Sequence, residues 1–247
     1  MKNYAPRTDL LGGRVILVTG AGSGLGRAAS LAYARHGATV ALLGRNEARL
    51  ESVYDEILAA GAAEPAMFPF DLAVADDRGL DNLAGAIGHH LKRLDGVLHS
   101  AHHFYNLSPL SLQTLEQWQT LMRVNLLAPF ALTRACLPLL RAAPSASVIF
   151  TGETHGHQPA AFWGGYAVAK AGLETLTRIW SEELGNETAL RVNTLIPGPV
   201  ATSFRARTHP GLDPTHMRQP ADLMPAYLYL MGDDSRDIRG QIVPCDD

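Results

Sequence analysis

VILVTGAGSGLG, residues 15–26, is the stretch that decides the fold of this 247-residue chain. It opens on four apolar residues that predict a buried strand, and the residues that follow, LGRAASLAYARH (25–36), have the apolar spacing of an amphipathic helix. In the turn between them, Gly20, Gly24 and Gly26 permit a tight bend, a ligand close to the backbone and close packing of helix on strand. The first amide groups of such a helix can bind an anion, and the strand-turn-helix context predicts a dinucleotide pyrophosphate there.

Outward from this stretch, short apolar strands alternate with helices along the chain. The expected strands are 15–18, 39–43, 67–70, 96–98, 147–150 and 191–196, and the expected helices are 25–36, 47–60, 77–91, 115–140 and 166–184. Strands that are apolar throughout and separated by crossover helices predict a parallel sheet covered on both faces. The predicted fold class is therefore α/β, a Rossmann-type doubly wound sheet in three α/β/α layers, with residues 1–247 forming a single NAD(P)-binding domain. The proline-rich residues 197–220 are expected to form a loop, either a lid over a substrate or an irregular surface connection.

Composition and charge exclude several functional classes. Lys and Arg number 21 and Asp and Glu 24, a net charge of −3 without a basic stripe, so nucleic acid is not an expected partner. No apolar run reaches the roughly 18 residues of a membrane span, and the first residues lack the apolar core of a secretory signal. Cys136 and Cys245 lie far apart without CxxC spacing, which fits a reducing compartment. We therefore expect a soluble, cytoplasmic protein with no membrane partner.

The second expected strand ends in LLGRN, where dinucleotide folds specific for NAD offer an acidic side chain to the ribose. Arg45 occupies that position, and its guanidinium either binds a 2′-phosphate through two hydrogen bonds or is a solvated surface group. Ser23 and Asn46 could add hydrogen bonds. Asp71 ends the third strand and either accepts a hydrogen bond from the adenine amino group or caps the next helix. The expected cofactor is NADP(H), with NAD(H) as the less favoured option.

YAVAK, residues 166–170, carries the expected chemistry. Tyr166 and Lys170 are four residues apart and so lie on one face of a helix. The ammonium of Lys170 is expected to favour the phenolate of Tyr166, whose ordinary pKa is about 10. Tyr166 is therefore the expected general acid and base.

These motifs together resemble the short-chain dehydrogenase/reductase family over nearly the whole chain. The stretches that carry the resemblance are TGAGSGLG (19–26), Asn125 in the long middle helix, YAVAK (166–170) and RVNTLIPGPVATSF (191–204). LLGGRVILVTGAG (10–22), HGATVALLGRN (36–46) and MPAYLYLMGDDS (224–235) look closer still to a group of bacterial oxidoreductases within it. The resemblance implies pro-S hydride transfer between NADP(H) and a carbonyl or alcohol substrate. It also implies that Asn125 bends its helix to hold a proton-relay water and that Lys170 binds the nicotinamide ribose.

The resemblance extends to the cofactor site and to assembly. Pro197, Gly198 and Thr202 would line the nicotinamide. The full set expected to contact the cofactor is Gly20, Ser23, Gly24, Leu25, Gly26, Arg45, Asn46, Asp71, Leu72, Ser100, Ala101, Tyr166, Lys170, Pro197, Gly198, Val200 and Thr202. Related proteins commonly pair through their two long helices, so a homodimer or homotetramer is expected.

One departure from the family pattern affects the chemistry directly. The serine that orients the substrate oxygen, thirteen residues before the tyrosine, is Glu153 in this chain. A carboxylate there opposes both a phenolate and a developing alkoxide, and it raises the pKa of Tyr166. Either Thr154 supplies the hydroxyl, or Glu153 is a protonated donor, or Glu153 pairs with a cationic substrate. The alternative function is a catalytically impaired NADP(H)-binding protein of the same fold.

A second departure follows the fourth strand, where the family's Asn-Ala-Gly is Ser100, Ala101 and His102. The side chain of His102 is expected to hinder close passage of the backbone beside the cofactor, unless the loop shifts. Arg205 and Arg207 bind either an anionic group of the substrate or the cofactor phosphate, or they are solvated loop charges.

Five histidines are expected to face the same crevice: His99, His102, His103, His155 and His157. They could orient Glu153 or an anionic substrate, replace the acid and base, or simply be polar loop residues. Their spacing matches no strong metal motif, and no metal is expected. Four neighbouring aromatic residues favour an apolar substrate pocket or, equally, core packing: Phe104, Tyr105, Phe162 and Trp163.

Overall fold

Seven parallel strands form a single sheet in the computed structural model, which describes residues 4–185 and 189–245. The strands are β1 (Val15–Thr19), β2 (Thr39–Gly44), β3 (Ala66–Pro69), β4 (Gly96–His99), β5 (Ala146–Thr151), β6 (Leu190–Ile196) and β7 (Ile242–Pro244). They are ordered β3-β2-β1-β4-β5-β6-β7, with Val18 of β1 opposite Leu42 of β2 on one side and Leu98 of β4 on the other. The strand order reverses between β1 and β4, the point at which doubly wound sheets bind ligands beyond the carboxyl ends of their strands.

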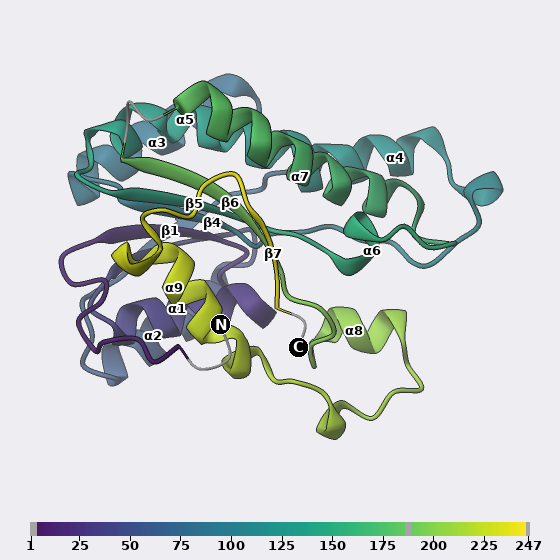
Figure 1. Ribbon diagram of the computed structural model, residues 1–247, viewed down its shortest axis with the longest axis horizontal. Helices are drawn as coiled ribbons and strands as arrows, with labels where there is room; N and C mark the ends of the chain where they lie inside the picture. Colours follow the sequence, from purple (N-terminus) through teal and green to yellow (C-terminus); the bar gives the residue numbers. More distant parts are fainter. Residues whose placement is uncertain (1–3, 186–188, 246–247) are drawn as a thin grey trace.

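Helices cover both faces of this sheet (Figure 1). On one face lie α1 (Gly24–Arg35), α2 (Glu47–Ala59) and α9 (Met224–Met231), and on the other α3 (Asp77–Leu91), α5 (Ala128–Ala142) and α7 (Gly164–Leu184). Each face buries its own cluster of hydrophobic side chains. The expected three-layer doubly wound fold is confirmed. Across the described parts of the chain, no helix combines the length and apolar character needed to span a membrane.

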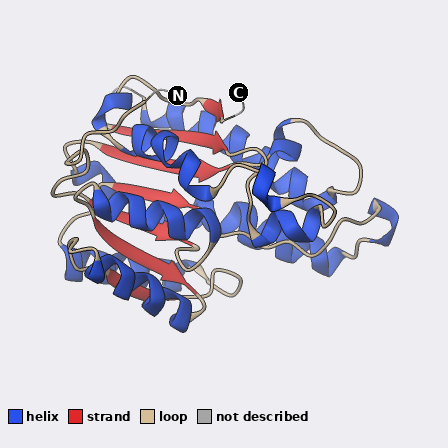
Figure 2. Cartoon of the chain, turned by 90° about the horizontal axis from the view of Figure 1, so that it is seen from below, coloured by secondary structure: helices blue, strands red, loops and turns tan. Residues whose placement is uncertain are grey.

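The carboxyl ends of the strands and the amino ends of the helices that follow them lie on the same side of the molecule. Figure 2 shows the arrowheads of the strands pointing to the side where loops and short helices gather. These short elements are η1 (Leu110–Leu112), α4 (Leu115–Met122), α6 (Thr154–His157), α8 (Ser203–Thr208), η3 (Pro214–His216) and η4 (Pro220–Leu223). A further short element, η5 (Asp233–Ser235), lies at the opposite edge, where Asp233 contacts Arg14 and Ser145.

The single helix expected over residues 115–140 needs correction. α4 passes into α5 through a π-helical turn, η2 (Arg123–Leu127), with Asn125 at its centre. The Asn125 side-chain amide donates to the carbonyl of Leu121 at 2.9 Å and to the carbonyl of His103 at 2.8 Å. A side chain that binds the helix's own carbonyl and a neighbouring loop at once favours a widened turn at that point.

The loop expected over residues 197–220 is also only partly correct, because it contains α8 and η3. Thr202 caps α8, since its hydroxyl oxygen accepts a hydrogen bond from the backbone N–H of Arg205 at 3.3 Å. The third expected strand, residues 67–70, lies one residue earlier, as β3. The remaining expected strands and helices are present with ends that differ by up to two residues.

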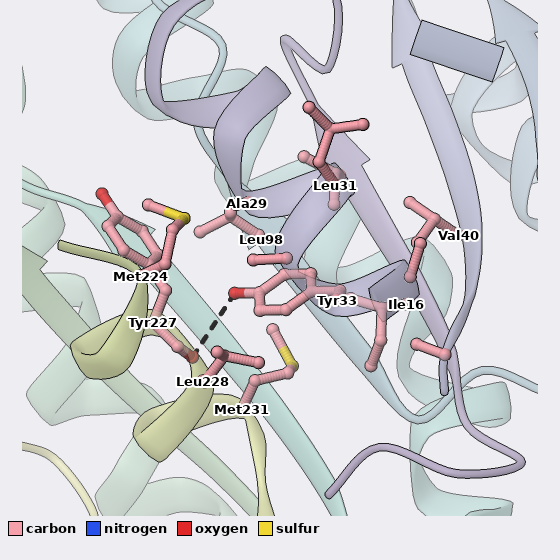
Figure 3. Packing of buried hydrophobic residues seen from close by; sticks show 14 of the residues in the cluster. Ile16, Ala29, Leu31, Tyr33, Val40, Leu98, Met224, Tyr227, Leu228 and Met231 are labelled. Carbon is pink, nitrogen blue, oxygen red and sulfur yellow. Dashed lines mark hydrogen bonds between the residues drawn. The ribbon is translucent and has the colours of Figure 1, made fainter. Parts of the chain in front are cut away.

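α9 and β7 are elements that the sequence analysis does not predict. α9 is buried on most of its surface, so its residues MPAYLYLM lack an amphipathic stripe. It packs against α1, where the hydroxyl of Tyr33 donates to the carbonyl of Tyr227 at 3.5 Å, and Met224, Leu228 and Met231 surround the contact (Figure 3). This packing completes the face of the sheet that carries the glycine-rich turn.

Candidate active site

A continuous cavity lies at the carboxyl ends of the strands and is lined by nearly every residue expected to bind the cofactor or to act in catalysis. Of those residues, Gly26 and Asn125 are the ones that do not line it. The turn after β1 and the end of β2 form one end of the cavity. Glu153, Thr154, Tyr166 and Lys170 form the other, with the loop after β6 closing one side.

The glycine-rich turn is shaped to hold an anion. Gly24 has a φ of +53° and faces the open cavity, where the nearest atom that an added Cβ would meet is the Thr202 methyl at 3.8 Å. Ser23 precedes α1 but makes no capping hydrogen bond, and no acidic residue lies in the first turn. The positive end of α1 is therefore not neutralised by the chain itself. Gly26 has the expected packing role, because an added Cβ would lie 2.3 Å from the carbonyl oxygen of Gly20.

Two arginines follow β2: Arg45 comes directly after the strand, and Arg49 lies in the first turn of α2. Arg45 and Arg49 both line the cavity and are exposed, and neither guanidinium has an ion-pair partner within residues 4–185 and 189–245. The side-chain oxygen of Asn46 caps α2 by accepting from the Arg49 N–H at 3.0 Å, which leaves its amide group to donate. The sequence analysis misses Arg49, although its spacing of four residues from Arg45 is a usable signal.

Asp71 lies on the cavity wall, and the alternative that it caps the next helix is wrong. Its carboxylate accepts from the N–H of Ala73 at 2.9 Å, within its own loop. The residue that caps α3 is Asp76, which accepts from the N–H of Gly79 at 2.8 Å. Of the two roles expected for Asp71, hydrogen bonding to the adenine amino group is therefore the one that remains.

The loop after β4 is fixed by Thr19, a residue that the sequence analysis also misses. The buried hydroxyl of Thr19 accepts hydrogen bonds from the N–H groups of Ser100, at 3.1 Å, and Ala101, at 3.0 Å. His102 does not adopt a left-handed φ, so the backbone there does not require glycine. Its ring stands edge-on to Phe204, with centroids 5.1 Å apart, and forms part of the cavity wall.

Tyr166 and Lys170 lie side by side on α7, both about 3% exposed. The ammonium of Lys170 donates to the main-chain oxygen of Thr151 at 2.8 Å and lies 5.7 Å from the centroid of the Tyr166 ring. Burial lowers the pKa of Lys170 to about 8, with Glu153 acting in the opposite direction. Burial and the charge of Glu153 raise the pKa of Tyr166 well above its usual value. Both effects oppose the phenolate expected beside Lys170 and favour the phenol in the protein by itself.

Glu153 lies on the cavity wall at the start of α6, and Thr154 is next to it. Burial raises the pKa of Glu153, whereas the charges of Lys170 and Arg205 lower it. The position at which a hydroxyl is expected therefore carries an acid whose neutral form is favoured by its surroundings. Such a carboxyl group can donate a hydrogen bond when it is protonated.

Asn125 supports the site from outside the cavity. Its side-chain oxygen accepts from the N–H of His103 at 3.0 Å, and its amide donates to the carbonyl of the same residue. The bend expected at Asn125 is present as η2. Both polar atoms of the side chain are used within the protein, so its direct task is to hold the loop after β4.

The five histidines do not face one crevice, which corrects the expectation. His99 is buried, its Nε2 lies 2.9 Å from the hydroxyl of Thr133, and burial lowers its pKa to about 3. His157 points away from the cavity to Glu174, 3.0 Å away, and His155 packs on Trp163. His102 and His103 line the cavity. Across the described chain, no group of three or more His, Cys, Asp or Glu side chains is placed to hold a metal ion.

The aromatic residues divide between the site and the surface. Phe104, Trp163 and Tyr166 form a buried cluster against which Phe204 of α8 packs. Tyr105 and Phe162 are instead exposed. The wall beside Tyr166 is thus apolar, as expected, but it is completed by Phe204, which the sequence analysis does not place there.

Comparison with known proteins agrees with this geometry. Residues 14–213 match the family model described as short chain dehydrogenase. The chain is 44% identical over 234 residues to the uncharacterized oxidoreductase YciK of Escherichia coli K12, covering 95% of this chain and 92% of YciK. A short chain dehydrogenase of Escherichia coli CFT073 solved with NADPH is 42% identical, with a TM-score of 0.95 over 98% of this chain and 100% of the other. A Shigella flexneri relative solved with NADP is also 42% identical, with a TM-score of 0.93 over 96% and 99% of the two chains.

Proposed function

Because the chain belongs to the short chain dehydrogenase family, we propose that it is an NADP(H)-dependent oxidoreductase that interconverts a carbonyl group and an alcohol. One observation supports this more than any other: a single cavity joins Arg45, beyond the positive end of α1, to the Tyr166 and Lys170 pair. In this proposal the whole chain, residues 1–247, works as one NAD(P)-binding domain.

The residues of the cavity fit an NADP(H) molecule. The Ser23 to Gly26 turn leaves an open, positively polarised recess for the pyrophosphate. Arg45 and Arg49, which have no ion-pair partner among the described residues, line the cavity where a 2′-phosphate would lie. Asp71 and Leu72 would hold the adenine, and Pro197, Gly198, Val200 and Thr202 the nicotinamide. The structures of relatives that contain NADP and NADPH support the same choice of cofactor.

Reduction converts a carbonyl compound, NADPH and one proton into an alcohol and NADP⁺. The bound cofactor supplies the hydride, from its pro-S side as the family resemblance implies. Tyr166 donates its phenolic proton to the carbonyl oxygen, and its raised pKa keeps it in the form that can do so. Lys170 holds a positive charge beside the phenolate that remains, and Asn125 and η2 shape the route by which water returns the proton.

Glu153 takes the place of the hydroxyl that orients the substrate oxygen. In its protonated form it would donate a hydrogen bond to that oxygen, and Thr154 is the neighbouring hydroxyl that could share the task. We place Glu153 and Thr154 with Tyr166, Lys170 and Asn125 in the catalytic set.

The exposed apolar side chains on α5 and α7 support a homodimer or homotetramer. The buried free thiol of Cys136 supports a reducing compartment such as the cytoplasm.

The test combines calorimetry with turnover. Wild-type protein should bind NADPH and oxidise it in the presence of members of a carbonyl panel, and Tyr166→Phe should bind NADPH equally well while losing turnover by orders of magnitude. Failure to bind NADPH would overturn the cofactor assignment. Tight binding with turnover only in Glu153→Ser would show instead a nucleotide-binding protein whose chemistry is impaired.

A further inference from the structure

Arg205 is a cation of the cavity that the proposed reaction does not use. It lies in the first turn of α8, is partly buried and lines the cavity together with Glu153, Tyr166 and Lys170. Its Nε atom is buried and has no hydrogen-bond partner. No ion pair of 4.0 Å or less and no hydrogen bond from its guanidinium joins it to another described residue. A buried guanidinium nitrogen without a partner is unfavourable, and a ligand acceptor would relieve that cost.

The surroundings of Arg205 favour an anion as that ligand. His155 and His209 lie on either side of Trp163, with ring centroids 4.2 Å and 6.3 Å from it. Burial and the charge of Arg205 lower the pKa of both imidazoles, so they are neutral at neutral pH and can donate or accept. Arg205 therefore supplies the positive charge of this corner.

The apolar wall makes the corner selective. Phe204, adjacent to Arg205 in α8, packs with Phe104, Trp163 and Tyr166. Phe204 and Tyr166 are the two rings of this cluster that line the cavity. A carboxylate beside them loses water, and an arginine with two parallel N–H donors is the side chain best suited to replace that water. The reacting oxygen would meanwhile lie against Tyr166, within the same cavity.

Glu153 does not exclude an anionic ligand. Burial raises the pKa of its carboxyl group and so favours the neutral form, although the charges of Lys170 and Arg205 act in the opposite direction. A ligand carboxylate on Arg205 would leave Glu153 beside Lys170. The cofactor phosphates have their own recess at the other end of the cavity, formed by the turn before α1 and by Arg45 and Arg49.

We propose that the substrate is an oxo acid and its product the corresponding hydroxy acid, with the carboxylate bound by Arg205 in the cavity, beside the ring of Phe204. This inference rests on the proposed function, because it assigns a substrate class to the same site.

The experiment measures binding without turnover. Protein saturated with NADP⁺ cannot reduce a ketone, so calorimetry reports affinity alone. The probes are two matched pairs, 2-oxo-4-phenylbutanoate with its ethyl ester and 4-oxo-4-phenylbutanoate with its methyl ester. In the wild type, the acid of at least one pair should bind tenfold or more tightly than its ester.

In Arg205→Met and Arg205→Gln, the acid should lose that advantage while the ester binds as before, and the affinity for NADP⁺ should stay within about twofold of wild type. Arg205→Lys should keep part of the preference. The matched control is Arg178→Met, which removes an exposed arginine of α7 and should leave the preference intact.

Acids that bind no better than their esters in both pairs would overturn the inference while leaving the proposed function standing. A loss of NADP⁺ affinity in both neutral Arg205 variants would also overturn it, because Arg205 would then bind the cofactor. Absence of NADP⁺ binding in the wild type would instead refute the proposed function itself.

Discussion

Burial raises the pKa of Tyr166 and lowers that of Lys170, and Glu153, when it is ionised, raises both values. Reduction needs Tyr166 as the phenol and Lys170 as the ammonium, and the ammonium is lost as the pH rises through about 8. Glu153→Gln removes the negative charge, so both pKa values should fall. The alkaline limb of the pH profile of kcat/KM should therefore move to lower pH than in the wild type. A limb that stays in place, or moves upward, would contradict the assigned electrostatics.

Arg45 is expected to set the preference for NADPH over NADH. A charge-assisted hydrogen bond to a phosphate contributes about 1.5 to 3 kcal/mol, or roughly a 10-fold to 150-fold change in affinity. Arg45→Met should weaken NADPH binding by about this factor and change NADH binding little, as measured by calorimetry with each nucleotide. Arg49→Met serves as the comparison, and a larger effect there would transfer the main role to Arg49. Equal losses for both nucleotides would mean that neither arginine reads the 2′-phosphate.

At the scale of elements, α8 is joined to the loop after β4 across the cavity. One guanidinium nitrogen of Arg207 donates to the carbonyls of Phe104, at 3.1 Å, and Tyr105, at 2.6 Å. Neighbouring residues of both segments line the cavity, so this contact ties two of its walls together. Arg207→Met removes this contact, so the rate constant for NADPH release should increase. The increase should be only several-fold, because the contact is partly exposed to solvent and such contacts contribute little free energy. Stopped-flow fluorescence measures that rate, and an unchanged value would show that the contact does not restrain release.

The order of the elements could be predicted because β1, β2, β4, β5 and β6 are short, largely buried runs rich in apolar residues, and helices separate each from the next. β7 could not, since it has three partly exposed or exposed residues, and it exists by pairing with β6 far away in sequence. α9 was missed for the opposite reason: a helix buried nearly all round has no polar face to reveal its period. Both failures concern contacts between distant segments.

The residues of the candidate site likewise fall into those that could be predicted from the sequence and those that could not. The glycine-rich turn, Tyr166 and Lys170 could be predicted because their spacing is local. Thr19 could not, since its hydroxyl acts on the N–H groups of a loop some 80 residues away. The direction of His157 likewise depends on Glu174 in another helix. Residues that bind across the fold carry little signal in their immediate neighbours.

At the scale of the whole molecule, Arg191 ties β6 to the ends of β5 and α9. It is only 2% exposed, and its guanidinium donates to the hydroxyl of Ser145 and to the carbonyls of Ala146, Met231 and Gly232. Burial lowers its pKa to about 10, so it is charged at neutral pH. The carbonyls at the end of α9 thus depend on one buried cation.

Arg191→Leu should lower the free energy of unfolding by about 3 to 5 kcal/mol, because it strips partners from several buried acceptors. For a chain of this size the melting temperature should fall by roughly 6 to 20 °C, as measured by calorimetry. The control is Arg236→Leu, whose ion pair with Asp233 is exposed and should contribute less than about 1 kcal/mol. Similar losses in the two variants would contradict the assigned role of Arg191.

The outer surface of α5 and α7 bears on assembly. Val168 and Ile179 are about half exposed and eleven residues apart, so about three helical turns place them on one side of α7. On the neighbouring segment, Leu127 and Phe130 are exposed as well, and the Phe130 ring lies 6.3 Å from that of Trp180. An apolar surface spread over two adjacent helices is typical of a self-complementary interface.

Wild-type protein should therefore elute as a dimer or tetramer, with its mass measured by light scattering. The double variant Val168→Glu with Ile179→Glu should shift it toward the monomer, because four carboxylates would then be buried at one apolar interface. The control pair Leu110→Glu with Leu112→Glu lies in η1, away from these helices, and should leave the mass unchanged. A wild-type monomer, or an oligomer indifferent to charge on α7 but broken by charge on η1, would place the interface elsewhere.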